Sequence, residues 1–137
     1  MSGEAVGRLK RRARSFLKAA GLVDDPDLKA FFAEQAMQLH LKAVLLELFG
    51  EEARTHSVRE LLGLLARRLR DAGYTGEAMR VMEFAAAERL ALLEADEAYI
   101  TARYGLGYSV GEAERLVDLA GRLIALLEEV ARRVKLG

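Results

Sequence analysis

The fold is decided by residues 28–49, which read LKAFFAEQAMQLHLKAVLLELF. Apolar residues recur there at helical spacing and cover most of the helix circumference, not a single face. The run follows Asp25-Pro26-Asp27, which is typical of a helix start: an acidic N-cap, proline at the first helical position and an acid in the first turn. Gly50 is a typical helix end. This pattern predicts one long, heavily buried helix at the centre of the protein.

Helical periodicity dominates the rest of the chain, and no segment shows sustained two-residue alternation. Further helices are expected over residues 6–20, 57–73, 75–102 and 109–134. Ser57 and Ser109 each open a capping box, and Thr75 is expected to cap the fourth helix. Short connections between these segments predict an all-α, up-and-down bundle of four to five helices, forming a single domain of residues 1–137.

The composition narrows the classes of function. The 137 residues include 21 basic and 21 acidic side chains, so no global charge attracts nucleic acid, and such a role would need a local patch. The lack of cysteine excludes disulfides and thiolate metal sites, and two histidines are too few for a His-based metal centre. We therefore expect no metal and no cofactor. No apolar run is long enough to span a membrane and the N-terminal segment is basic and amphipathic, so a cytoplasmic protein is expected.

Two further expectations come from composition. The helices over residues 28–49 and 77–102 carry more apolar surface than a small monomer can cover, which favours a homodimer. The chain has no asparagine and many arginines, a composition that suits a thermophile. A genome rich in G and C would give much the same bias.

Three of the four tyrosines gather around one arginine, at Tyr99, Arg103, Tyr104 and Tyr108. Hydroxyl-bearing rings beside a guanidinium form a surface suited to phosphates and bases. The alternative is structural: the rings cover the edge of the core, and Arg103 caps the helix end or pairs with an acid of residues 94–97.

The first helix carries a run of basic residues on the side opposite its apolar face: Arg8, Lys10, Arg11, Arg12, Arg14 and Lys18. Such a run is ordinarily a solvated face. The alternative is a surface that follows nucleic-acid phosphates, whose affinity would fall steeply with added salt. No glycine-rich phosphate loop, zinc-protease motif or serine elbow occurs in the sequence.

Three segments together resemble one family. Residues 31–45 are similar to the "aaeQAaElalKAll" helix of HEPN domains, and residues 55–62 resemble that family's "TH-s-l-x-x-L-l" helix start. Residues 98–104 resemble its "AYI-x-x-RYP" motif, with Gly105 in place of proline. Tyr108-Ser109 leading into Glu112 fits the family's last helix. The resemblance spans about residues 5 to 135, with the segments in the expected order.

The resemblance implies a small helical bundle that dimerises with its functional cleft near the two-fold axis. Many HEPN proteins are encoded beside a minimal nucleotidyltransferase (MNT) as a toxin–antitoxin pair. Many are metal-independent ribonucleases with an Arg-x(4–6)-His motif, in which histidine moves the 2′-hydroxyl proton and arginine stabilises the phosphorane. Here the arginine is Arg103, but Tyr108, Ser109 and Val110 stand where the histidine is required.

The other candidate residues each allow two interpretations. The family has lysine at Lys42, which indicates an ion pair with a carboxylate of another helix, or else ligand binding. His56 precedes a capping box, where it can bond the helix end or serve as a base near Arg103. A tyrosine near the motif is an adenylylation target of the MNT partner in related toxins, which suggests Tyr108. His40 is expected to be a hydrogen-bonded core histidine.

The sequence therefore predicts a HEPN homodimer that binds nucleotide or RNA and forms one half of an MNT pair. The candidate binding residues are Arg103, Tyr104, Tyr108, Tyr99, His56 and Lys42. The missing histidine favours binding over catalysis but leaves two alternatives: a metal-independent ribonuclease with an altered base, and a non-catalytic helical protein-interaction module.

Overall fold

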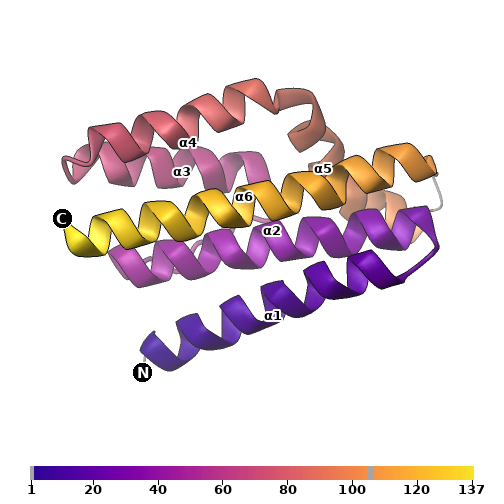
Figure 1. Ribbon diagram of the computed structural model, residues 1–137, viewed down its shortest axis with the longest axis horizontal. Coiled ribbons are helices and arrows are strands. Elements are labelled where there is room, and N and C mark those ends of the chain that lie inside the picture. The colour runs from indigo at the N-terminus through magenta and orange to yellow at the C-terminus, as the bar shows by residue number, and fades with distance from the viewer. Residues whose placement is uncertain (1, 105–106) are drawn as a thin grey trace.

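The computed structural model describes the backbone of residues 2–104 and 107–137, and the side chains of residues 3–98 and 107–137. Across these residues the chain is helical, with no strand. The helices are α1 (Ser2–Leu22), α2 (Pro26–Phe49), α3 (Val58–Asp71), α4 (Thr75–Ala87), α5 (Arg89–Tyr104) and α6 (Val110–Leu136). The all-α bundle predicted from the sequence is thus confirmed (Figure 1).

Helix α2 lies at the centre of the bundle. It packs against α1, α3, α5 and α6, and in Figure 1 it runs between α1 and the other helices. Met37, Leu41 and Leu45 of α2 are fully buried, together with leucines of α3 and α6. Because neighbours cover α2 on nearly every side, its apolar residues need no single face, as the sequence predicted.

The predicted caps set most of the helix ends. The Asp25 carboxylate accepts hydrogen bonds from the backbone N–H groups of Asp27 (2.9 Å) and Leu28 (3.2 Å), which begins α2. Gly50 ends α2 in a left-handed conformation with φ of 64°. At the start of α6, Ser109 and Glu112 form both bonds of the predicted capping box.

The prediction of one helix over residues 75–102 was wrong. The chain turns at Glu88, which separates α4 from α5. Arg122 of α6 contacts this turn: it binds the Glu88 carboxylate and lies 6.0 Å from the centre of the Phe84 ring. Thr75 is not the cap either, because α4 begins after Tyr74 without a side-chain capping bond. The break between α4 and α5 is therefore accompanied by a contact from α6, and the local sequence does not indicate it.

None of the helices, over the residues described, is long and apolar enough to cross a membrane.

Candidate functional site

Five polar side chains meet where α2, the loop of residues 50–57 and α5 come together. We call Glu34, Gln38, Lys42, His56 and Asp96 the polar junction. Gln38 is at its centre: its amide nitrogen donates to Glu34 Oε2 (2.7 Å) and to the His56 backbone carbonyl (3.2 Å). Its amide oxygen accepts from Lys42 Nζ (3.1 Å) and lies 3.1 Å from His56 Nδ1. One buried amide thus positions both Lys42 and His56.

The bonds to Gln38 also define the hydrogen-bonding state of His56. Lys42 can only donate and the His56 carbonyl can only accept, so the amide oxygen and nitrogen of Gln38 are assigned unambiguously. His56 Nδ1 must then donate to the amide oxygen. In the neutral ring this leaves the lone pair on Nε2, and the His56 residue is exposed to solvent. The junction therefore holds an oriented imidazole with its basic nitrogen on the opposite side from Gln38.

Glu34 is the buried acid of the junction, with 1% of its surface exposed. Its carboxylate accepts from the amides of Gln35 (2.8 Å) and Gln38 (2.7 Å). Burial raises the pKa of Glu34, and the nearby Asp96 charge raises it further, while the two amide bonds lower it. Glu34 therefore serves as the fixed acceptor that orients the Gln38 amide.

Asp96 ties α5 to the start of α3. Its carboxylate accepts from the Ser57 hydroxyl (2.7 Å), the Val58 backbone N–H (2.7 Å) and Arg59 Nε (3.1 Å). A carboxylate at a helix N-terminus is favoured by the helix dipole as well as by the hydrogen bonds. This contact holds α5 against the loop that carries His56.

The predicted site residues fall into two groups. The structure brings Lys42 and His56 together: each nitrogen lies 3.1 Å from the same oxygen, so the two are at most about 6 Å apart. Tyr99, Arg103 and Tyr104 belong to α5, but their side chains lie outside the described residues.

Tyr108 has a structural position. Its hydroxyl donates to the Glu94 carbonyl, its backbone N–H donates to the Asp27 carboxylate (2.6 Å), and its half-buried ring packs against the core. These contacts agree with the structural interpretation of this tyrosine, in which the ring covers the core edge.

Two expectations about individual residues need correction. Lys42 bonds an amide one turn earlier on its own helix, not a carboxylate of another helix. His40 is buried as expected, but neither ring nitrogen has a hydrogen-bond partner among the described residues. The charged groups near His40 are Lys10 and Arg14 of α1 and Glu47 of α2. Lys10 is bound to Glu47 (2.9 Å), so these two charged groups pair with each other and not with the His40 ring.

Sequence reasoning missed Glu34, Gln38 and Asp96. A signal for the first two was present, because Glu34, Gln38 and Lys42 recur every four residues on an otherwise apolar helix. Residues at that spacing share one face and contact each other. Asp96 carried no such signal, since its partners are 37 to 39 residues away in the chain.

Comparison with known families identifies the fold. A family model described as HEPN domain matches residues 6–130. The chain belongs to the HEPN family. No curated protein and no solved structure matched this HEPN domain.

Two of the three positions at which the resemblance requires the ribonuclease histidine, Tyr108 and Ser109, have other roles here. Tyr108 is bound to Glu94 and Asp27, and Ser109 is the N-cap of α6. The described residues also contain no cluster of acidic or histidine side chains that could hold a metal ion. His56 lies instead beside Lys42 in the polar junction, where both contact the Gln38 amide oxygen.

Proposed function

We propose that this HEPN domain binds RNA or nucleotides through their phosphate groups. The binding surface is the polar junction together with the end of α5 that carries Arg103. The observation that carries the proposal is the shared acceptor: one Gln38 oxygen positions the Lys42 ammonium and the His56 ring side by side. The ammonium and the protonated form of the imidazole, in which Nε2 also carries a proton, can both donate to one phosphate group.

Arg103 supplies the second part of the surface. It lies seven residues, or about two helical turns, after Asp96 in α5. Asp96 holds this helix against the loop that carries His56. A guanidinium grips phosphate through paired N–H donors, which a lysine cannot do. The family resemblance assigns the phosphate-binding arginine to this position.

Binding of labelled single-stranded RNA and of labelled AMP at low salt tests the proposal. Arg103→Ala and Lys42→Met are each expected to weaken binding about tenfold, which corresponds to the loss of one charge-assisted contact. Arg132→Ala, an exposed residue on α6, is the control and should leave affinity unchanged. Unchanged affinity in both Arg103→Ala and Lys42→Met would refute the site and favour a helical protein-interaction module. No affinity for either ligand in the wild type would refute the function.

The same proposal includes a homodimer that pairs with an MNT nucleotidyltransferase. Its support is the family membership and the exposed apolar residues of α4 and α5, among them Met79, Met82 and Leu90. Analytical ultracentrifugation should give twice the monomer mass. A nucleotidyltransferase encoded next to this gene should co-purify with it. A monomer that captures no such partner would contradict both expectations.

The orientation of His56 favours a second candidate function, a metal-independent ribonuclease with an altered base. His56 Nε2 would take the proton of a ribose 2′-hydroxyl. The 2′-oxygen would then attack phosphorus and form the 2′,3′-cyclic phosphate, while the P–O5′ bond breaks and the 5′-oxygen takes a proton from solvent water. Gln38 would hold the ring through Nδ1, as the third member of a nucleophile–base–orienter arrangement does.

Cleavage of end-labelled total RNA in EDTA tests this candidate. The wild type should cleave, while His56→Ala and Arg103→Ala should each lose at least about a hundredfold of the rate, the usual contribution of a general base. Gln38→Leu should lower the rate less than His56→Ala, because it removes the orientation and not the base. Intact RNA with the wild type, or equal cleavage by His56→Ala, would reject His56 as a base.

A further inference from the structure

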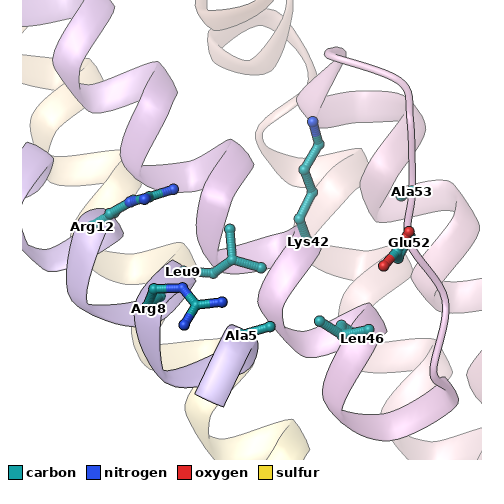
Figure 2. A pocket seen from close by; sticks show the side chains of 8 residues that line it. All are labelled: Ala5, Arg8, Leu9, Arg12, Lys42, Leu46, Glu52 and Ala53. Carbon is teal, nitrogen blue, oxygen red and sulfur yellow. The ribbon is translucent and has the colours of Figure 1, made fainter. Parts of the chain in front are cut away.

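A second cationic surface lies beside the polar junction, between α1, α2 and the loop of residues 50–57. It is a hollow of about 270 Å³ with Arg8 and Arg12 on one side and Lys42 on the other. Figure 2 shows both guanidinium groups extending from α1 toward the side where Lys42 stands. Leu9, Leu46 and two alanines form the apolar part of the lining, and Glu52 is its one acid. We call this hollow the α1–α2 groove.

Arg8, Arg12 and Lys42 form no ion pair within the described residues, and the same is true of Arg11, Arg14 and Lys18 of α1. Lys10, on the same helix, is bound to Glu47 at 2.9 Å. Arg8 and Arg12 are four residues apart in α1, a spacing at which like charges repel. An anion between them would remove that repulsion.

Lys42 adds a partly desolvated charge. Its ammonium donates to a neutral amide, the Gln38 oxygen, at 3.1 Å. Burial lowers the pKa of Lys42, and the charge of Glu34 offsets this only in part. An anion in the groove would therefore be stabilised by three cations and opposed by two carboxylates, Glu52 in the lining and Glu34 near Lys42.

Lys42 also connects the groove with the polar junction. The side chain lines the groove, and its nitrogen shares the Gln38 oxygen with the His56 ring. A linear polyanion could thus contact Arg8 and Arg12 and continue past Lys42 to His56. A free mononucleotide would reach only part of this path.

We propose that the α1–α2 groove binds the phosphodiester backbone of single-stranded RNA and leads it to the polar junction. This inference rests on the proposed function for its class of ligand but assigns a separate set of residues. Arg8 and Arg12 contact phosphates without reading base identity. The apolar lining leaves room for the sugar between successive phosphates.

The test is fluorescence anisotropy with a labelled uridine dodecamer, from about 50 to about 300 mM salt. The variant is Arg8→Gln with Arg12→Gln. Its matched control is Arg11→Gln with Lys18→Gln, which removes the same charge from exposed positions of α1 outside the groove. The groove variant should lose on the order of tenfold in affinity at the lowest salt. The slope of log K against log salt should become shallower by about 1.4, which is two contacts at 0.7 each.

Several outcomes would overturn the inference. Equal effects of the groove variant and its control would show a general charge effect. AMP binding as tight as that of the dodecamer would show a site for free phosphate esters instead of a backbone. If Arg103→Ala weakens RNA binding and the groove variant does not, the groove fails while the proposed function stands. If the wild type binds no RNA at low salt, both fail. Thermal melts of all variants, expected to coincide, exclude unfolding as the cause.

Discussion

His40 makes the stability of this protein depend on pH in a calculable way. The ring is 1% exposed on α2, and neither nitrogen has a hydrogen-bond partner among the described residues. Burial lowers its pKa from 6.5 to about 4, and the charges of Lys10 and Arg14 lower it as well. Glu47 acts in the opposite direction but less strongly. The folded protein therefore holds this histidine neutral at pH 7.

The size of the effect follows from the two pKa values. In the unfolded chain His40 titrates near 6.5, so between pH 6.5 and 4 the unfolded state binds more protons than the folded state. The free energy of unfolding must then fall as the pH falls. A difference of about 2.5 pKa units corresponds to a loss of about 3 kcal/mol by pH 4, with the full stability present above pH 6.5.

Chemical denaturation of the wild type and of His40→Leu, at several values from about pH 7.5 to about pH 4.5, measures this loss. The variant should be more stable by about 1 kcal/mol at neutral pH, because it removes two buried polar atoms without partners. Its advantage should grow by about 2–3 kcal/mol at the acidic end.

Comparing the two proteins isolates His40 from the carboxylates that both contain. Among these carboxylates Glu34 matters most, because its pKa is raised and the folded state therefore binds more protons at this group than the unfolded state does. Its contribution to the free energy of unfolding rises as the pH falls, opposite to that of His40. An advantage that stays constant across this pH range would refute the reasoning. It would mean that the ring keeps an ordinary pKa, and hence that a polar partner or solvent reaches it. NMR titration of the His40 ring would decide the same point directly.

Three other variants test the fold. Asp96→Ala should destabilise the protein by about 2–3 kcal/mol, because two donors at the start of α3 and the Arg59 side chain lose their shared acceptor. Asp96→Asn should lower the stability less, and thermal melts of the two variants measure the difference. Gly50→Ala should lower the free energy of unfolding by about 1 kcal/mol, since Gly50 has a φ of 64°, a left-handed conformation that alanine disfavours. Gly121→Ala should stabilise α6 by up to about 1 kcal/mol, because alanine has a higher helix propensity than glycine and the added methyl meets no atom within 4 Å. A loss of stability would show that the methyl group does not fit at this position.

Local sequence predicted the features of this fold that depend on local chemistry. Asp25 and Gly50 bound α2 because capping and left-handed backbone are properties of a few neighbouring residues. The break at Glu88 could not be predicted in this way, because no glycine or proline is present there. Arg122 contacts that turn from a helix more than thirty residues away. The partners of Asp96 could not be predicted from local sequence either, because they are 38 and 39 residues away in the chain.

The candidate site follows from the burial of α2, not from an exposed loop. A helix covered on most sides must satisfy its polar side chains largely with one another, and Glu34, Gln38 and Lys42 do so at four-residue spacing. The loop of residues 50–57 completes the network only where the His56 ring and carbonyl meet Gln38. Both polar ends of Gln38 are thereby used, and Lys42 or His56 would each lose a hydrogen bond to Gln38 if it reoriented. The positions of the cation and the imidazole that we assign to phosphate binding are therefore set in advance by the core of the bundle, which reduces the entropy lost when an anion binds.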